Sequence, residues 1–299
     1  MIDLHTHSTI SDGSFTPAEL AQHAKDLGIR AFALTDHDNM AGCEEAAAAA
    51  QKLGVGFIGG MELTVEYIGH KLHVVCLGFD PAHPSFRLIY QRVRAIKEGR
   101  IPDIIDYIHD QGVDISLAKV EPFAHGGPID RYAIMRYLVS LHLYDRAQPL
   151  WDHYLDPAAV ALGLNFSITA EEALPLIREA GGVTSLAHFH KTIGLKGLTR
   201  QEQEAAILRL HQMGLDGMER WYPNYSHDDA AFAGYMIEKY HLLPTGGTDF
   251  HGTNRPGVEM GTGMDGNICI PDDFLTAIRE KCAARREKIM RYRKGNKRP

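Results

Sequence analysis

The first fourteen residues, MIDLHTHSTISDGS (residues 1–14), decide the fold and carry the first sign of a functional site. Residues 1–7 have the pattern of a short strand, and in a strand the two-residue spacing of His5 and His7 turns both side chains to one face. Asp12 follows in the polar, glycine-containing segment after this strand. The chain holds 17 histidines in 299 residues, so the rest of the sequence has to show whether this group is more than chance.

Helices and strands alternate beyond this stretch. We expect helices at residues 16–28, 42–54, 169–182, 200–214 and 227–241, and strands at residues 29–38, 55–67, 71–80, 183–190, 215–223 and 242–252. Strands separated by helices of this length predict an α/β fold with right-handed crossovers and a parallel sheet, either open or closed into a barrel. Residues 81–164 do not follow this alternation and have mostly helical patterns, which predicts a helical insertion.

The composition is that of a globular protein, with 44% hydrophobic and 23% charged residues. The net charge of -7 argues against a protein that coats nucleic acid, although residues 285–299 are strongly basic. The four cysteines form no CxxC pair, which favours reduced thiols. Neither a signal-peptide pattern nor an apolar stretch of membrane-spanning length is visible, so we expect a cytoplasmic protein without membrane contact.

Further polar side chains fall at or near the ends of later strands. They are Asp36, His37, Glu62, His73, His188, Asp249 and His251. In a parallel α/β barrel the carboxyl ends of the strands form the active-site face, so these side chains would converge with those of the first fourteen residues. Imidazole and carboxylate ligands together suit Mn²⁺, Fe²⁺ or Zn²⁺ better than Mg²⁺ or Ca²⁺.

Nine of these side chains, six of them histidines, exceed what one tetrahedral ion can use. A carboxylate such as Glu62 can bridge two ions. Two ions about 3.5–4 Å apart can hold both the attacking and the leaving oxygen of a displacement at phosphorus. The ligand pattern therefore predicts a multinuclear metal site suited to phosphate esters.

The stretches DLHTHSTISDGSFTPAEL (3–20), LTDHD (34–38), GGMELT (59–64), HVVCLGF (73–79), LAH (186–188) and GGTDFHG (246–252) resemble the PHP (polymerase and histidinol phosphatase) superfamily. The resemblance implies a distorted (β/α)7 barrel formed by residues 1–80 and 165–299, with residues 81–164 as a helical insertion domain that contributes to substrate binding. It also implies three divalent metal ions, with Mn²⁺ as the first expectation and Fe²⁺ or Zn²⁺ as alternatives. Carried over position by position, it assigns three ligand sets: His5, His7, Glu62 and Asp249; Glu62, His73 and His188; and Asp12, His37 and His251.

The insertion is similar to that of PHP phosphoesterases that act on nucleoside bisphosphates and short RNA ends, which carry the motif R-P-H-x-A-R-x-L-V. The matching stretch is RYAIMRYLV (131–139), which keeps Arg131 and Arg136 as phosphate ligands but has Tyr132 and Ala133 in place of proline and histidine. The resemblance implies hydrolysis of phosphate esters of small nucleotides or ribose phosphates by a metal-bound hydroxide. The enzyme would be either a phosphatase on nucleoside bisphosphates or a cyclic phosphodiesterase.

Five further side chains are candidates for roles around the metal ions. His190 and His227 are candidates for protonating the leaving group, and Asp36 is expected to orient a neighbouring histidine. Arg178 is a third candidate for contacting the substrate phosphate. Glu219 could orient a ligand histidine or form an ion pair with a nearby cation.

Three alternative functions stay open. A 5′-3′ exonuclease on short RNA or DNA would use the basic residues 285–299 and show a Michaelis constant that depends strongly on salt. A metal amidohydrolase would cleave amides instead of phosphate esters. A non-catalytic metal-binding module would lose its fold on chelation without showing turnover. The complete ligand pattern and the two arginines favour the phosphoesterase.

Overall fold

The computed structural model describes residues 1–124, 127–144, 147–165 and 167–295, with side chains up to residue 291. The chain divides into two compact units. The first consists of residues 1–90 together with residues from 168 onward, and the second of residues 91–167. That residues 81–164 form a separate insertion domain stays a prediction.

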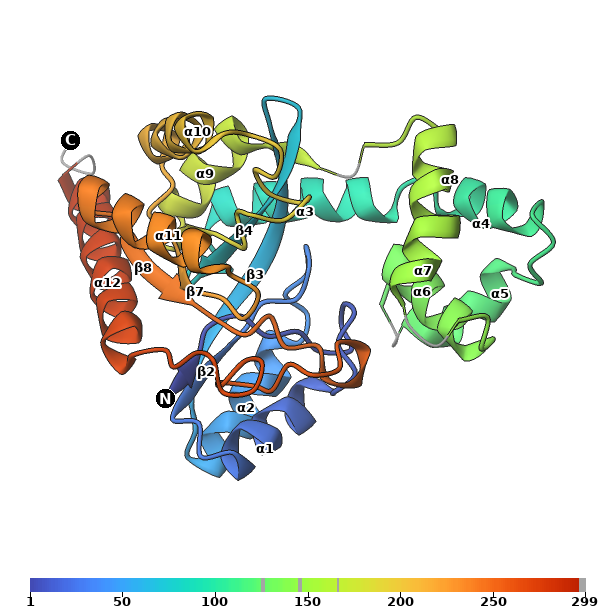
Figure 1. The fold of residues 1–299 in the computed structure, drawn as a ribbon, viewed down its shortest axis with the longest axis horizontal. Helices are drawn as coiled ribbons and strands as arrows, with labels where there is room; N and C mark the ends of the chain where they lie inside the picture. Colours follow the sequence, from blue (N-terminus) through green and yellow to red (C-terminus); the bar gives the residue numbers. More distant parts are fainter. Residues whose placement is uncertain (125–126, 145–146, 166, 296–299) are drawn as a thin grey trace. The chain divides into compact units, whose positions relative to one another are not determined.

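The first unit is built on one mixed sheet (Figure 1). Its strands are β1 (Ile2–Asp3), β2 (Ala31–Leu34), β3 (Gly56–Tyr67), β4 (His70–Leu77), β5 (Ile168–Thr169), β6 (Val183–Leu186), β7 (Gly217–Trp221) and β8 (Leu243–Gly246). Seven strands follow each other in the order β1-β2-β3-β4-β6-β7-β8, and β5 pairs with β3. The chain after β1 closes the path, because Leu4 N donates to Gly246 O and Thr6 bridges to Phe250. The predicted α/β barrel is confirmed.

Helices cover the outside of this sheet (Figure 1). They are α1 (Pro17–Asp26), α2 (Cys43–Leu53), α9 (Ala170–Glu179), α10 (Arg200–Met213), α11 (His227–Tyr240) and α12 (Asp272–Gly295). Helix α1 begins at a capping box of Thr16 and Glu19 with Pro17 in its first turn. Apolar side chains of α1 and α2 pack on β2, and those of α12 pack under the barrel strands. This packing fixes the strand ends that carry the predicted site residues.

The direction of β4 corrects the prediction of a parallel sheet. β3 and β4 form an antiparallel hairpin, and β4 also pairs antiparallel with β6. The reason is the connection: only Ile68 and Gly69 join the two strands, whereas a parallel crossover needs a dozen or more residues. The register places His73 opposite Thr64 and therefore beside Glu62, although His73 does not lie at a carboxyl strand end.

The first strand is shorter than predicted. Ladder pairing stops at Asp3, and the chain from Leu4 to His7 continues through separate hydrogen bonds to the chain near the ends of β2 and β8. Asp3 explains the change, because its fully buried carboxylate accepts from the backbone N–H groups of His5, Thr248 and Gly261 and from the Thr248 hydroxyl. Asp3 thus links the segment of His5 to the segments of Thr248 and Gly261.

Replacing Asp3 with alanine is expected to lower the free energy of unfolding by about 3–5 kcal/mol, because it leaves four buried donors without an acceptor. Urea unfolding followed by circular dichroism measures this loss. Asp26→Ala is the matched control, since Asp26 is exposed and accepts from the exposed Gln22 side chain, and its effect should stay within about 0.5 kcal/mol. Equal small losses in both variants would contradict this role of Asp3.

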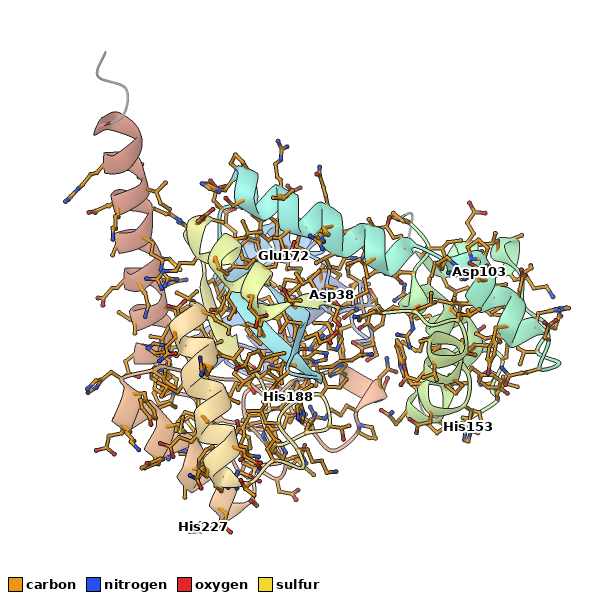
Figure 2. All side chains as sticks on the ribbon, turned by 90° about the horizontal axis from the view of Figure 1, so that it is seen from above. Asp38, Asp103, His153, Glu172, His188 and His227 are labelled. Atoms are coloured by element: carbon orange, nitrogen blue, oxygen red, sulfur yellow. The ribbon has the colours of Figure 1, made fainter. Side chains whose placement is uncertain are left out.

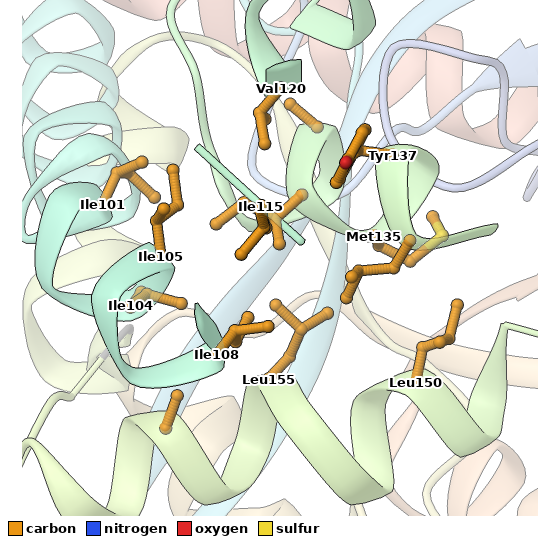
Figure 3. Close-up of a cluster of buried hydrophobic side chains, with 14 of the residues drawn as sticks. Ile101, Ile104, Ile105, Ile108, Ile115, Val120, Met135, Tyr137, Leu150 and Leu155 are labelled. Carbon is orange, nitrogen blue, oxygen red and sulfur yellow. The ribbon is translucent and has the colours of Figure 1, made fainter. Parts of the chain in front are cut away.

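The second unit is helical, as expected for the insertion. Its elements are the end of α3 (Pro84–Glu98), α4 (Ile101–His109), α5 (Leu117–Val120), a 3₁₀ turn (Glu121–Ala124), α6 (Arg131–Ser140), α7 (Gln148–Leu150), a π-helical turn (Trp151–Leu155) and α8 (Asp156–Ala161). The unit has its own hydrophobic core (Figure 3). Ile101, Ile104, Ile105 and Ile108 line one face of α4 because they recur at helical spacing, and they belong to the same core as Leu155.

None of the helices in the described residues is both long and apolar enough to span a membrane.

Candidate metal centre

Glu62 stands at the centre of a buried polar cluster in the first unit. It lies in β3, and its carboxylate is fully buried. Its two oxygens lie 2.9–3.2 Å from imidazole nitrogens of five residues: His5, His7, His37, His73 and His188. A carboxylate surrounded by so many nitrogen atoms is the arrangement expected of a ligand shared between metal ions.

Two further carboxylates complete the cluster. Asp249 Oδ1 lies 3.2 Å from His7 Nε2 and 3.5 Å from His5 Nε2. Asp12 Oδ1 lies 3.2 Å from His251 Nε2, and Asp12 Oδ2 lies 3.6 Å from His37 Nε2. We call the whole set the histidine–carboxylate cage: His5, His7, Asp12, His37, Glu62, His73, His188, Asp249 and His251. The structure thus brings together all nine residues that the sequence offered as metal ligands.

Three groups within the cage have ligand atoms within 4.8 Å of one another. They are His5, His7, Glu62 and Asp249; His7, Asp12, His37 and His251; and His37, Glu62 and His73. The first group equals a predicted ligand set, and the second adds His7 to another. In the third, His37 joins Glu62 and His73, while His188 contacts Glu62 Oε1 at 2.9 Å. The assignment of each residue to one ion stays a prediction.

The buried polar atoms of the cage fit bound cations. Atoms without any hydrogen-bond partner include His5 Nε2, His7 Nε2, Asp12 Oδ1, Glu62 Oε2 and His73 Nδ1. Leaving such atoms unpaired costs about 1–3 kcal/mol each. The ring nitrogens of His5, His7 and His73 lie 3.0–3.2 Å from a Glu62 oxygen. Two ligand atoms that each lie about 2.1 Å from the same ion, at right angles, have this separation. The cage therefore satisfies the geometric requirement for divalent ions.

Charges within the cage also favour cations. Burial raises the pKa of Glu62, but the neighbouring imidazoles of His5, His73 and His37 outweigh it and hold the pKa well below its usual range. The Asp249 carboxyl, next to Lys191 and Arg255, has its pKa lowered in the same way. Burial lowers the pKa of His188 to about 3. These shifts favour ionised Glu62 and Asp249 and a neutral His188, the states in which these groups bind metal. Burial lowers the pKa of His7, but its contacts with Asp249 and Glu62 outweigh this and raise it to about 10, so this ring would release a proton on binding an ion.

Backbone geometry near the cage is unusual. His188 and Asp249 have φ angles of 24° and 54°, in the left-handed region that non-glycine residues rarely adopt. Gly247 passes so close to the chain after β1 that a Cβ there would lie 2.2 Å from His5 Cβ. Such strain persists only where the surroundings hold the chain in place, which is typical of functional sites.

A second layer of carboxylates holds the cage histidines. Glu219 in β7 is buried, its Oε1 lies 2.7 Å from His5 Nδ1, and its Oε2 accepts the His188 backbone N–H at 2.7 Å. The first contact leaves His5 Nε2 to face Glu62. A carboxylate behind a histidine fixes the tautomer and ring orientation that metal binding needs. Glu219 therefore has the geometry of an orienting residue, one of the two roles considered from the sequence.

We expect Glu219→Gln to weaken Mn²⁺ affinity by about 10–100-fold. A glutamine side chain has one acceptor oxygen and cannot serve both His5 and the His188 N–H. Equilibrium dialysis of the metal-free protein against Mn²⁺ measures the change. Glu238→Gln, at an exposed position of α11, is the control. Wild-type Mn²⁺ affinity in Glu219→Gln would contradict the orienting role.

The buried carboxylate of Asp36 accepts from Ser8 N, Ser8 Oγ and Ser11 Oγ at 2.7–2.8 Å. Ser11 Oγ in turn lies 3.4 Å from His7 Nδ1. Asp36 thus reaches His7 through Ser11 and fixes the loop that carries Asp12. Its expected role in orienting a histidine stays a prediction, with an intervening serine.

The other predicted residues have different surroundings. His190 is half-buried, its ring contacts Tyr222 and Tyr225, and burial lowers its pKa. Figure 2 shows His227 far from His188, and it is exposed at the start of α11. Arg178 is exposed on α9, whose buried side chains face the sheet. The structure thus does not bring His227 or Arg178 to the cage, and all three roles stay predictions.

Arg131 and Arg136 both lie in α6 of the helical unit. Arg131 is buried, donates from Nη2 to Asp156 Oδ1 at 2.5 Å, and stacks 4.7 Å from the Trp151 ring. Arg136 Nε donates to Phe123 O at 2.8 Å. Both guanidinium groups therefore have partners within their own unit, and their role in phosphate binding stays a prediction.

Three residues near Asp249 were missed as site residues. Tyr222, Lys191 and Arg255 all contact Asp249 Oδ2. Lys191 and Arg255 stand three and four residues after the cage histidines His188 and His251, and this proximity was the available signal. The contact itself depends on how three separate loops meet, which spacing along the chain does not reveal.

Comparisons with known proteins agree with this geometry. Residues 3–165, more than half of the chain, match the model of the PHP domain. A 5′-3′ exoribonuclease of Haemophilus influenzae is 30% identical over 249 residues, which cover 83% of this chain and 89% of that protein. A 3′,5′-nucleoside bisphosphate phosphatase of Chromobacterium violaceum is 30% identical over 279 residues, which cover 90% of this chain and 94% of that protein.

A solved structure from Bifidobacterium adolescentis, described as a metal-dependent phosphoesterase, has the same fold. It superposes with a TM-score of 0.79 at 25% identity and covers 94% of this chain and 96% of its own. The family match, the two relatives and this structure point in one direction, and they confirm the resemblance found in the sequence. The chain belongs to the PHP family.

Proposed function

We propose that this protein is a metal-dependent phosphoesterase that releases phosphate from small phosphorylated nucleotides. The observation that carries the proposal is the buried cage, in which nine histidine and carboxylate side chains converge and eight of them form three groups whose ligand atoms lie within 4.8 Å of one another. Membership of the PHP family and the names of the relatives support hydrolysis of phosphate esters as the reaction.

The cage would hold three divalent ions, one for each of its three groups, with Mn²⁺ as the first expectation and Fe²⁺ or Zn²⁺ as alternatives. When bound, such ions polarise phosphoryl oxygens and lower the pKa of a water molecule. The chain's own contribution is orientation. Glu219 holds His5, Asp36 and Ser11 hold the loop of His7 and Asp12, and Glu62 joins the groups.

Within this reaction class we favour a nucleoside 3′,5′-bisphosphate as substrate. The bisphosphate phosphatase relative is similar over 94% of its own length, which includes the helical segment. That segment contains Arg131 and Arg136, the two arginines that the sequence resemblance assigns to phosphate binding. A cyclic ribose phosphate is the other small substrate that the same cage could hydrolyse. A nucleotide substrate and four unpaired cysteines both fit a cytoplasmic location.

Exoribonuclease activity is the second candidate function. It is favoured by the Haemophilus influenzae relative, which has the same percentage identity to this chain as the bisphosphate phosphatase. The net charge of -7 argues against tight binding of long polynucleotides, so short RNA is the relevant substrate.

Phosphate release by Mn²⁺-loaded protein tests the proposal. The panel compares nucleoside 3′,5′-bisphosphates, ribose cyclic phosphates, 5′-phosphorylated short RNA and amide substrates, and His7→Asn is the inactive control. We expect the bisphosphates to have the highest kcat/KM. Preference for RNA would favour the exoribonuclease. Turnover of amides alone, or none with the ions bound, would contradict the proposed function.

A further inference from the structure

The second oxygen of Asp249 belongs to a separate group of contacts at the rim of the cage. Asp249 Oδ1 faces His7, whereas Oδ2 accepts from Tyr222 OH at 2.7 Å, from Arg255 Nη1 at 2.7 Å and from Lys191 Nζ at 3.3 Å. One carboxylate oxygen therefore has three donors, two of them on cations. These donors come from the loops after β6, β7 and β8.

The charges in this group do not balance. In the part of the chain that the structure describes, Asp249 is the one acid within 4.0 Å of either cation. Its negative charge is also shared with the cage through Oδ1. The side chain of Lys191 is 35% exposed and that of Arg255 is 21% exposed, so the excess positive charge is accessible to solvent. Such a charge beside a metal site attracts an anionic ligand.

The terminal N–H groups of Arg255 all donate to acceptors of the protein. Nη1 donates to Asp249 Oδ2 and to the carbonyl oxygens of Asp249 and Thr248, and Nη2 donates to Tyr222 OH at 2.9 Å and to Asn224 Oδ1 at 2.5 Å. Four terminal N–H groups meet at least four acceptors. Arg255 therefore fixes Asp249 and Tyr222 and has no terminal donor left for a ligand.

Lys191, in contrast, has N–H donors left for a ligand. Its ammonium has three N–H donors and one carboxylate contact, at 3.3 Å, which is longer than the 2.7–2.9 Å or so typical of charge-assisted hydrogen bonds. The ammonium also lies 4.9 Å from the centre of the Tyr222 ring. Among the described residues, two donors thus remain for a ligand, and little is lost if the existing contact lengthens.

The backbone holds Lys191 in this place. Lys191 N donates to His188 O at 2.9 Å, which forms a turn directly after a cage histidine. Gly194 closes the loop, because a Cβ there would lie 2.7 Å from Phe189 O and 2.8 Å from Lys191 O. The turn therefore fixes the backbone of Lys191 beside the cage, whereas its long side chain can still adjust to a ligand.

We propose that Lys191 binds a phosphoryl oxygen of the substrate, whereas Arg255 and Tyr222 position Asp249. The division rests on donor counting: Lys191 has donors left for an anion, and Arg255 does not. The identity of the anion as a phosphate rests on the proposed function. A phosphate held by Lys191 would lie next to the ions of the cage, at the place where the ester bond is broken.

The test uses inorganic phosphate, the product of the proposed reaction, as the probe. Calorimetric titration of Mn²⁺-loaded Lys191→Met should show a phosphate Kd raised about 10–100-fold, with the same Mn²⁺ content per chain as the wild type. Lys196→Met, an exposed lysine of the same loop, is the matched control and should bind phosphate as the wild type does. Arg255→Met should instead retain less Mn²⁺, because Asp249 loses its support.

The outcomes separate this proposal from the proposed function. Unchanged phosphate affinity in Lys191→Met would overturn the proposal, and so would a loss of Mn²⁺ equal to that of Arg255→Met, because Lys191 would then also be a positioning residue. If the wild type hydrolyses no phosphate ester but Lys191→Met still weakens phosphate binding, the proposed function fails and the anion site stands.

Discussion

Glu62→Gln is expected to lower kcat/KM for phosphate release by about 10³-fold or more. Glutamine keeps the shape of Glu62 but removes a buried negative charge that five imidazole nitrogens surround. Removing one partner of a buried charged group costs about 3–5 kcal/mol, which corresponds to about 10²–10⁴ in rate or affinity. Because Glu62 belongs to two of the three ligand groups, the variant should also retain fewer Mn²⁺ ions per chain.

Steady-state kinetics and metal analysis by mass spectrometry measure both effects. Glu66→Gln is the matched control, because Glu66 lies on the same strand, four residues further on and outside the cage. The control should keep its activity within about twofold. If Glu62→Gln keeps the wild-type rate and metal content, Glu62 is not the shared ligand that the geometry indicates.

Removal of the metal ions is expected to lower the melting temperature of the protein by about 15–30 °C. Ions that bind only the folded chain stabilise it by about 2.7 kcal/mol each at a concentration of 100 Kd. Each kcal/mol shifts the melting temperature of a chain of this size by roughly 2–4 °C. Without ions, His5 Nε2, His7 Nε2 and Glu62 Oε2 also lack a hydrogen-bond partner among the described residues, which adds to the loss.

Differential scanning calorimetry with and without a chelator measures this shift, and returning Mn²⁺ should reverse it. Chelation should change the melting temperature of Glu62→Gln much less, because that variant has already lost ions. A wild-type melting temperature that does not respond to chelator, in protein shown to be metal-free, would mean that the cage needs no cation to fold.

The ligand residues could be predicted from the sequence because local spacing determines where they point. His5 and His7, like Asp249 and His251, stand two residues apart where a strand gives way to a loop, and β1, β2 and β8 are neighbours around the barrel. The alternation of strands and helices was therefore enough to bring these side chains together.

The direction of β4 was not predicted, although its cause is local. The two residues Ile68 and Gly69 between β3 and β4 permit only a hairpin, and reading the strands as a parallel series overlooked this short connection. His73 reaches the cage all the same, because β4 pairs with β3 next to Glu62. His73 was thus correctly predicted to reach the cage, but it does so through antiparallel pairing with β3 and not from the carboxyl end of a parallel strand.

The contacts around Asp249 and Asp36 could not be predicted from spacing. Tyr222, Lys191 and Arg255 come from three loops that meet only in the folded chain, and the donors that satisfy Asp36 are serines with no distinctive pattern. Conversely, His227 and Arg178 had suitable chemistry but lie on exposed helix positions. Residue type alone does not determine which side chains reach the site.

Anomalous X-ray diffraction from crystals of Mn²⁺-loaded protein tests the central claim most directly, because it both counts and locates the ions. We expect three Mn²⁺ peaks inside the cage, one in each ligand group, with Glu62 next to two of them. No peak in the cage, or peaks only elsewhere, in crystals whose dissolved protein still releases phosphate, would contradict the account.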